Sequence, residues 1–467
     1  MKIIGRETEK RQLKMLYESE ASEFLMVYGR RRVGKTFLIR EFFNHQFDFY
    51  LTGIANGTRA EQLMNFRNTM LRYDERIGSI LPKNWLEAFE QLTTYLEKTT
   101  TQRKVIFLDE LPWIDTPKSD FVKALELFWN SWASARNDVL LIVCGSAASW
   151  MVKNIVRNHG GLHNRLTYKM KINPFSLRES REFLHEKGIK WTNRMIAECY
   201  MVMGGIPYYL NLLDKSLSLA QNIDKMFFAE APLLEDEFAN LYHSLFKHAE
   251  DYILIIEALA KKKTGFTREE IMMQTKMSDG GGLTRKLDEL EQCGFIRKYM
   301  TTGAVSALYQ LVDFFSLFYF HFLKNASYYD TDNWIHLMGT PKYNTWCGLS
   351  FERLCFAHLP QIKQVLGISG VSTKTYSYYT KDAQIDMVID RGDHIINICE
   401  MKFTDMPFSI GKKYADILKN KIYSFKASLK KPRSIYLVMI ASDGLQQNEF
   451  ATSLVQNTIM LDELFCI

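Results

Sequence analysis

The chain has 467 residues, of which 47% are hydrophobic and 24% are charged, as in an ordinary soluble globular protein. This length is too great for one core, so we expect two to four domains. The net charge of +6 comes from residues 1–172, which hold 26 Lys and Arg against 19 Asp and Glu, and this distribution argues against a broadly basic DNA-binding tail.

The seven cysteines form no C-x-x-C pair and no Cys/His cluster with the spacing of a zinc site. We therefore expect reduced thiols in a cytoplasmic protein. The amino-terminal residues lack the long apolar segment of a signal peptide. The most apolar run, residues 314–323, is too short to span a bilayer, so we expect no membrane segment.

The first strand is predicted at residues 24–28, after an amphipathic helix that follows Gly5-Arg6-Glu7. The strand runs into Gly29-Arg30-Arg31-Arg32-Val33-Gly34-Lys35-Thr36-Phe37. This stretch fits the phosphate-loop (P-loop) pattern G-x-x-x-x-G-K-S/T, and a helix is predicted after it. The glycines let the backbone approach a polyphosphate, Lys35 supplies a charge for the β- and γ-phosphates, and the Thr36 hydroxyl is a ligand for Mg²⁺. The stretch predicts binding of a nucleoside triphosphate.

A second pair of candidate residues ends a buried strand predicted at residues 104–108. Asp109 and Glu110 follow its four apolar residues directly. In open α/β sheets, ligands bind at the carboxyl ends of the strands. We expect Asp109 to hold Mg²⁺ through water and Glu110 to activate the attacking water. A strand that ends in two acids by chance is the alternative.

Helical periodicity continues from residue 173 to about residue 245, and we interpret this segment as a lid over the nucleotide. Ser176 is a good N-cap for its first helix. The motifs RRRVGKT, FLDE, CGSA, NPFS and GGIPYYL occur in this order. Together they resemble the archaeal-type ATPase family, a P-loop group related to the AAA+ and STAND ATPases. The resemblance covers about the first half of the chain.

The resemblance implies ATP rather than GTP, because no guanine-binding N-K-x-D motif is evident. It also implies that Gly5-Arg6-Glu7 lies beside the adenine, although a plain amphipathic helix explains this segment equally well. Ser146 follows a predicted strand at residues 139–145, where AAA+-like ATPases carry a polar sensor of the γ-phosphate. A helix N-cap is the alternative role for this serine.

Arg165 is the candidate for stabilising the charge of the transition state. It would act in cis, or in trans as an arginine finger from a neighbouring subunit. Arg157 competes for this role, and a surface arginine is the alternative.

Residues 248–311 have the pattern of a winged helix, with three helices followed by two strands. In a DNA-binding protein, the third helix enters the major groove. This helix carries two basic and three acidic residues: Arg285, Lys286, Asp288, Glu289 and Glu291. Because the acidic residues oppose phosphate binding, DNA contact and an interdomain spacer are both left open.

The last part of the chain contains a second set of candidate residues. Asp386, in a strand predicted at residues 384–390, and Glu400-x-Lys402, in the next strand, fit the pattern D-(x)n-E-x-K of restriction-endonuclease-like domains. Asp386 and Glu400 would bind a divalent metal that polarises a scissile phosphate, while Lys402 helps to generate hydroxide. Glu352, in the preceding helix, is a further candidate metal ligand.

This region resembles the restriction-endonuclease-like domain found at the C-terminus of many archaeal-type ATPases. A basic helix at residues 410–431 and a strand at residues 434–440 complete its α/β/α core. The helix carries candidate phosphate contacts at Lys412, Lys413, Lys419 and Lys421. The motif is short and no Pro precedes Asp386, so alternating polar faces on half-buried strands are the alternative explanation. Asp390 is the other acid of the strand face.

We therefore predict an α/β protein in four domains. These are an AAA+-like P-loop ATPase core in residues 1–172, a helical lid in 173–245, a winged helix in 246–311 and a restriction-endonuclease-like domain in 312–467. ATP and Mg²⁺ are the expected cofactors. The first hypothesis is an ATPase coupled to DNA binding or to metal-dependent DNA cleavage. The alternative is a nucleotide-controlled switch or scaffold with an inactive C-terminal domain that binds protein or DNA. A homo-oligomer or a protein partner stays open.

Overall fold

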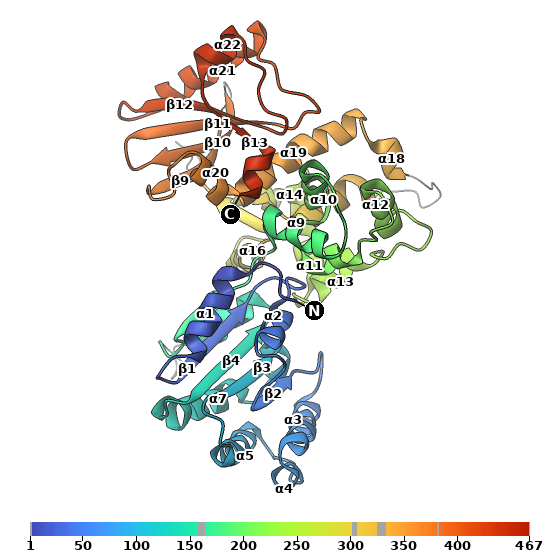
Figure 1. The fold of residues 1–467 in the computed structure, drawn as a ribbon, viewed down its shortest axis with the longest axis vertical. Coiled ribbons are helices and arrows are strands. Elements are labelled where there is room, and N and C mark those ends of the chain that lie inside the picture. The colour runs from blue at the N-terminus through green and yellow to red at the C-terminus, as the bar shows by residue number, and fades with distance from the viewer. Residues whose placement is uncertain (1, 157–163, 301–305, 325–332, 381–382, 467) are drawn as a thin grey trace. The chain divides into compact units, whose positions relative to one another are not determined.

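The chain divides into two compact units, residues 1–174 and residues 175–467 (Figure 1). The computed structural model describes residues 2–156, 164–300, 306–324, 333–380 and 383–466. In these ranges, no helix is long and apolar enough to cross a bilayer. The division into four domains stays a prediction, as does the position of the predicted lid over the nucleotide.

The first unit is built on a parallel sheet with the strand order β2-β3-β4-β1-β5. Its strands are β1 (Glu23–Tyr28), β2 (Phe49–Thr52), β3 (Lys104–Asp109), β4 (Val139–Gly145) and β5 (Tyr168–Lys171). Every residue of β3 and β4 is buried, which explains why these strands are nearly continuous apolar runs. Because all the strands are parallel, the residues that follow them gather at one edge of the sheet.

Helices cover both faces of this sheet (Figure 1). One core joins the side chains of Phe24, Met26, Ile106 and Leu141 to apolar side chains of α3, α5 and α7. The helices of this unit are α1 (Glu7–Tyr17), α2 (Lys35–Phe42), α3 (Arg59–Tyr73), α4 (Glu75–Gly78), α5 (Trp85–Lys98), α6 (Leu111–Ile114), α7 (Phe121–Ser131) and α8 (Ala148–Met151).

The second unit begins with a helical segment. Ser176 caps its first helix in a capping box with Glu179, as the sequence predicts. The helices of this segment are α9 (Leu177–Glu186), α10 (Asn193–Met203), α11 (Pro207–Leu212), α12 (Leu219–Phe227) and α13 (Glu237–His243). Phe227 of α12 packs against Phe315 and Phe318 of α17 (Phe314–Phe318), so the core of this segment includes residues far along the chain.

A small antiparallel sheet with the order β6-β8-β7 follows, together with three helices. In chain order these elements are α14 (Ala249–Ala260), β6 (Phe266–Thr267), α15 (Arg268–Thr275), α16 (Gly281–Gln292), β7 (Ile296–Tyr299) and β8 (Leu308–Leu311).

The last part of the chain forms a mixed sheet with the order β13-β12-β11-β10-β9. Its strands are β9 (Thr373–Tyr379), β10 (Gln384–Arg391), β11 (Ile395–Lys402), β12 (Ser434–Ala441) and β13 (Val455–Met460). The helices in this part are α18 (Asn333–Leu337), α19 (Pro341–Ala357), α20 (Leu359–Val365), α21 (Lys412–Ala427) and α22 (Glu449–Leu454). The basic helix α21 buries Ala415, Leu418 and Phe425 in the core with apolar residues of the sheet. The predicted strands and basic helix are therefore confirmed.

His358, between α19 and α20, holds this part of the chain to α9. Its Nε2 accepts a hydrogen bond of 2.9 Å from the Leu177 amide, and its Nδ1 donates to the Leu354 carbonyl at 2.9 Å. This pattern requires the neutral imidazole, since a protonated ring has no acceptor. Burial lowers the pKa of His358 from 6.5 to about 4.

We expect His358 to make the stability of the second unit depend on pH. The unfolded chain takes up the histidine proton near pH 6.5, whereas the folded chain does so near pH 4. Stability therefore falls as the pH falls through this window, by about 3 kcal/mol. Urea unfolding at pH 7, 5.5 and 4.5 measures this loss. H358Q keeps an acceptor but does not titrate, so its dependence on pH should be shallower. Parallel losses in wild type and H358Q would show that another group is responsible.

Candidate functional site

The P-loop turns from β1 into α2 through residues with positive φ angles. Gly29, Arg32 and Gly34 have φ angles of 148°, 70° and 86°. Gly34 is the N-cap of α2, and its left-handed backbone favours glycine. A Cβ atom on Gly29 would lie 2.3 Å from the Ile172 carbonyl oxygen. Neither glycine therefore tolerates a side chain. At Gly34 the backbone angle excludes it, and at Gly29 the close contact with Ile172 excludes it.

Lys35 and Thr36 begin α2, and both side chains contact groups of the predicted nucleotide site. The buried Lys35 ammonium donates to the carbonyls of Gly29 at 3.1 Å and Arg30 at 2.9 Å, so it is held over its own loop. The Thr36 hydroxyl donates to Oδ2 of Asp109 at 2.8 Å. The structure thus brings the P-loop and the end of β3 together.

Asp109 is buried at the end of β3. Burial raises its pKa, while the hydrogen bond from Thr36 opposes this rise. Its Oδ1 accepts a hydrogen bond of 3.0 Å from the Glu110 amide. The neighbouring Cys144, at the end of β4, has a thiol pKa well above its usual value because of burial and the nearby carboxylate. Sequence reasoning did not single out this cysteine as part of the site.

Glu110 and Ser146 form a contact that the sequence did not predict. Glu110 has a left-handed backbone with a φ angle of 52°, and its Oε1 accepts a hydrogen bond of 2.9 Å from the Ser146 hydroxyl. The serine therefore orients the candidate catalytic glutamate. Its predicted roles as a γ-phosphate sensor or as a helix N-cap stay predictions.

The oxygens of Thr36 and Asp109 fit Mg²⁺, which prefers hard oxygen ligands and binds one or two protein groups beside substrate phosphates. Mg²⁺ would supply charge neutralisation at the β- and γ-phosphates. The remaining P-loop residues differ in exposure. Arg30 and Val33 are buried, Arg31 and Arg32 are half-buried, and Phe37 is exposed.

Arg165 does not lie near these residues. It precedes β5, which is parallel to β1, with Tyr168 opposite Leu25 and Lys171 opposite Tyr28. The P-loop follows the carboxyl end of β1. Arg165 precedes β5 and therefore lies near the amino ends of these parallel strands, away from the P-loop. This placement contradicts its role in cis, while its role in trans stays a prediction. Arg157 lies outside the described residues.

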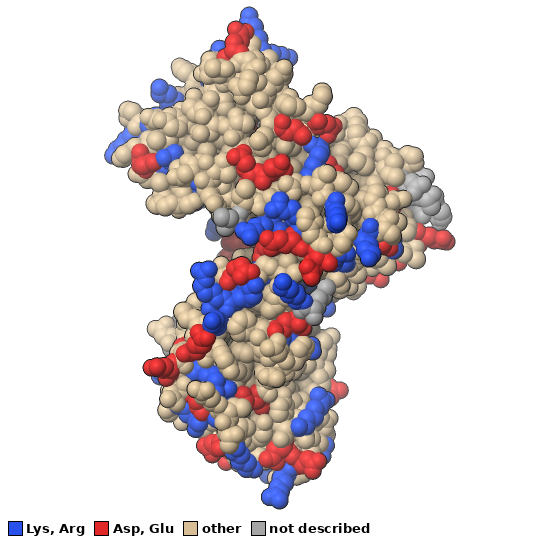
Figure 2. Space-filling view, viewed as in Figure 1, with Lys and Arg blue, Asp and Glu red and all other residues tan. Residues whose placement is uncertain are grey.

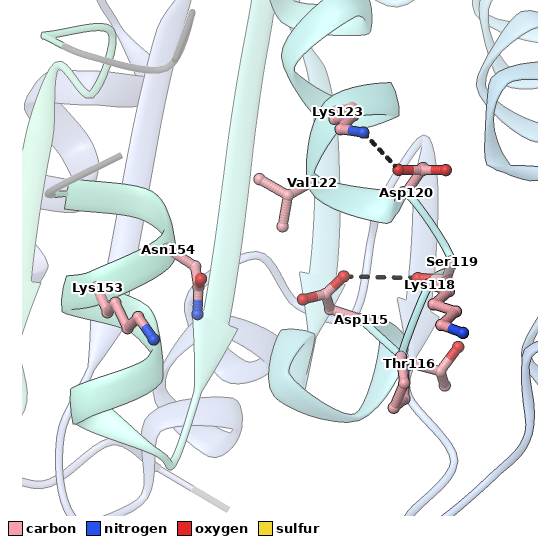
Figure 3. Close-up of a pocket in the computed structure, with 10 residues that line it drawn as sticks. Asp115, Thr116, Lys118, Ser119, Asp120, Val122, Lys123, Lys153 and Asn154 are labelled. Atoms are coloured by element: carbon pink, nitrogen blue, oxygen red, sulfur yellow. Dashed lines mark hydrogen bonds and ion pairs between the residues drawn. The ribbon is translucent and has the colours of Figure 1, made fainter. Parts of the chain in front are cut away.

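A cavity of about 700 Å³ lies elsewhere in the first unit (Figure 3). Its walls come from the segment after α6, from α7 and from residues 153–154. Two pairs of lining residues interact, Asp115 with Ser119 and Asp120 with Lys123. The P-loop, Asp109 and Glu110 are not among the residues that line it. This cavity is therefore not part of the candidate nucleotide site.

The C-terminal acids lie close together, but each is paired with a lysine. Lys263, in the turn before β6, contacts Glu352 and lies 3.6 Å from Oδ1 of Asp386. Glu400 is buried, and its Oε1 accepts a hydrogen bond of 2.7 Å from Lys421 of α21. Burial first, and then the charge of Asp386, raise the pKa values of Glu352, to about 7, and of Glu400.

The second carboxylate oxygens of Glu400 and Asp386 also accept hydrogen bonds. The Tyr414 hydroxyl donates to Oε2 of Glu400 at 3.1 Å, and the Met401 amide donates to Oδ2 of Asp386 at 3.2 Å. Lys402 lies over the Tyr414 ring, 4.8 Å from its centroid. Asp390 pairs with Arg433 instead.

The predicted metal ligands Glu352, Asp386 and Glu400 therefore do not fit a metal as they lie. Within the described residues, no group of three or more His, Cys, Asp or Glu side chains is arranged to hold a metal ion. The physical reason is that internal ammonium groups already neutralise these carboxylates. Sequence reasoning missed Lys263, because it lies far from the motif in the chain and no spacing connects them.

The comparisons with known proteins agree with the geometry of the first unit. Residues 3–213 match the model of a family described as an ATPase domain predominantly from Archaea. The chain contains an archaeal-type ATPase domain. With the P-loop, Asp109 and Glu110 in this domain, the protein is an ATPase.

One relative spans nearly the whole chain. An uncharacterized protein of Methanocaldococcus jannaschii is 25% identical over 427 residues, which cover 89% of this chain and 91% of that protein. Among solved structures, a Walker-type ATPase of Pyrococcus abyssi is 17% identical, with a TM-score of 0.50 over 68% of this chain and 96% of that chain. The ORC2 protein of Aeropyrum pernix is 14% identical, with a TM-score of 0.41 over 65% of this chain and 88% of that chain. The Pyrococcus structure supports the fold.

We expect K35A and E110Q to impair hydrolysis in different ways. K35A removes a charge from the phosphates and should raise the Kd for ATP about tenfold. E110Q keeps this charge but cannot activate water, so kcat should fall about 100-fold while ATP still binds. Phosphate release and nucleotide titration measure these effects. E90Q, on the exposed face of α5, is the control. An unchanged Kd for ATP in K35A, or an unchanged kcat in E110Q, would contradict the assignment.

S146A should lower kcat about tenfold and leave the KM for ATP nearly unchanged, because it frees Glu110 without removing a phosphate contact. S146T keeps the hydroxyl and should retain most of the rate. A large rise in KM for S146A would instead indicate direct contact with the nucleotide. Steady-state kinetics with varied ATP distinguish these outcomes.

Proposed function

We propose that this protein is an ATP-controlled switch, in which nucleotide binding and hydrolysis by the first unit control the binding of a protein or of DNA by a C-terminal domain that does not cut DNA. The observation that carries this proposal is the pairing of the C-terminal acids with lysines. It favours the second of the two hypotheses drawn from the sequence.

The charges of the acidic cluster argue against metal-dependent cleavage. A divalent metal at Asp386 and Glu400 would displace two ammonium groups, those of Lys263 and Lys421. The displaced lysines would lose carboxylate partners that lie in a buried site, and breaking such pairs is costly. Lys402 is held over an aromatic ring instead of being directed to a phosphate. The cluster is therefore better suited to joining the small β6-β8-β7 sheet to the mixed sheet that contains β10 and β11.

The contacts of residues 246–311 favour the interdomain spacer over DNA binding for the predicted winged helix. The three helices and two strands expected from the sequence are present, with an additional short strand, β6, between the first two helices. On its third helix, Lys286 pairs with Asp251 at 3.2 Å, and Glu289 accepts a hydrogen bond from the Tyr252 hydroxyl. These contacts hold the helix to α14. Arg297 of β7 donates to the Ser377 hydroxyl of β9 at 3.2 Å, which connects this module to the C-terminal sheet.

DNA binding without cleavage is the second candidate, and exposed lysines of α21 support it. Lys412, Lys413, Lys419 and Lys426 are exposed on this helix, whereas Lys421 is directed inward to Glu400. Lysines on one helix are suited to binding phosphates without reading sequence. Over the face shown in Figure 2, however, basic and acidic side chains are interspersed. We therefore rank a protein partner first.

The test measures DNA cleavage, DNA binding and ATP hydrolysis in the same preparations. Plasmid and single-stranded DNA are incubated with Mg²⁺ or Mn²⁺, with and without ATP. Wild type is compared with E400A/K402A and with the control K342A, which changes a lysine outside the motif. We expect no cleavage, with ATP hydrolysis intact.

Cleavage by wild type and K342A that is lost in E400A/K402A would contradict the switch and establish a nuclease. Titration of Mn²⁺ into wild type and D386N provides a second measurement. We expect the same heat of binding in both proteins, because Asp386 is already neutralised by Lys263. Binding that disappears in D386N would show that the metal displaces the lysine.

A further inference from the structure

We propose that Arg6 is a positioning residue, which connects the P-loop to the exit segment of the first unit, residues 172–174. Through these contacts it sets the affinity for ATP and relays the state of the loop to the point where the chain leaves the unit. The proposal rests on the ATPase activity alone and does not depend on the function of the C-terminal domain.

Arg6 is placed by an unusual local backbone. Gly5 and Arg6 both have left-handed conformations, with φ angles of 60° and 57°, just before α1. For an arginine this conformation is unfavourable, because the Cβ atom comes close to the following carbonyl oxygen. The side chain is nonetheless 94% buried, since its exposed fraction is 6%. A strained backbone and a buried guanidinium indicate that the contacts of this side chain fix the conformation.

One nitrogen of Arg6 connects two separate segments. Nη2 donates to the Val33 carbonyl in the P-loop at 3.3 Å and to the Asn173 carbonyl in the exit segment at 2.7 Å. Nη1 lies 3.6 Å from Oε1 of Glu9, which orients the guanidinium from α1. A guanidinium cannot lose its proton in a protein, so this connection is permanent across the physiological pH range.

The contact with Val33 determines where the next amide of the P-loop points. The peptide bond between Val33 and Gly34 is planar, and in a trans peptide the C=O and N–H groups point in opposite directions. Because the Val33 carbonyl is directed at Arg6, the Gly34 N–H points away from Arg6. Successive amides of such a loop form the nest that binds phosphate. Arg6 thus helps to orient the phosphate-binding amides through the Val33 carbonyl, without contacting the phosphates itself.

The exit segment contacts the P-loop at a second place as well. The Ile172 amide donates to the Tyr28 carbonyl at 2.8 Å, and the Ile172 carbonyl packs against Gly29 so closely that no Cβ fits between them. The beginning of the loop is therefore fixed to Ile172 directly, and its middle is fixed to Asn173 through Arg6. A change in the loop on phosphate binding reaches residues 172–173 by both routes, of which only the route through Arg6 depends on a side chain.

The experiment compares full-length wild type, R6Q, R6K and R11Q. Arg11 is exposed on the same helix and is the matched control. We expect R6Q to raise the KM for ATP about tenfold and to change kcat less than about twofold, because Lys35, Asp109 and Glu110 are untouched. R6K keeps the charge on a shorter side chain, so its KM should be intermediate. R11Q should match wild type.

Hydrogen exchange in the peptide of residues 168–176 measures the relay, with and without saturating ADP and Mg²⁺. In wild type and R11Q, nucleotide should slow exchange in this peptide. In R6Q this response should be smaller than in wild type even at saturation, because only the backbone contact through Ile172 remains, while the P-loop peptide itself still responds in full. A purely structural role would raise exchange with and without nucleotide but leave the response intact.

The proposal is overturned if R6Q has the KM of wild type, or if the response of residues 168–176 in R6Q equals that of wild type at saturating ADP. Should R6Q be too unstable to purify, R6K decides the question, and a KM and exchange response equal to those of wild type overturn the proposal. A wild-type protein without ATP hydrolysis would contradict the ATPase assignment itself, which is a different result from either of these.

Discussion

The hydrogen bond between Thr36 and Asp109 is the contact on which the nucleotide site depends. These residues follow β1 and end β3, and β4 lies between the two strands in the sheet. They meet at 2.8 Å because parallel strands end at a common edge. Glu110 continues this row to Ser146 at the end of β4. The spacing of the candidate catalytic groups is thus determined by the sheet, which is a rigid support for a site that must hold its geometry.

The P-loop is fixed on both of its sides. On one side, the Lys35 ammonium lies over the carbonyls of Gly29 and Arg30. On the other side, Arg6 holds the Val33 carbonyl, and Ile172 packs against Gly29. This arrangement explains how a loop of three successive arginines, whose charges repel one another, keeps one conformation. It also connects the loop to the last residues of its own unit.

The two acidic sites of the protein differ in the partner that each carboxylate has. Asp109 accepts a hydrogen bond from a neutral hydroxyl, which leaves its negative charge available to a cation. Glu400 accepts a hydrogen bond from an ammonium group, and Glu352 and Asp386 share another, so these charges are already compensated. Buried carboxylates therefore differ in chemistry between the two units: Asp109 is available to a cation, whereas the C-terminal acids are held in ion pairs.

Local sequence determined the strands, the helices and the P-loop, because each of these depends on neighbouring residues. The pattern around Lys35 and the apolar run before Asp109 predicted the elements that the structure contains, and the chemistry assigned to these residues stays a prediction. Apolar alternation likewise predicted the strands that carry Asp386 and Glu400. Only the tertiary structure decided which groups meet. Lys263 reaches Asp386, Ser146 reaches Glu110 and Arg6 reaches Asn173 across long stretches of chain. Arg165, by contrast, is placed beside the amino end of β1, away from the P-loop, by the parallel pairing of β1 with β5. Such contacts follow from how the sheets and helices pack, and no local spacing in the sequence encodes them.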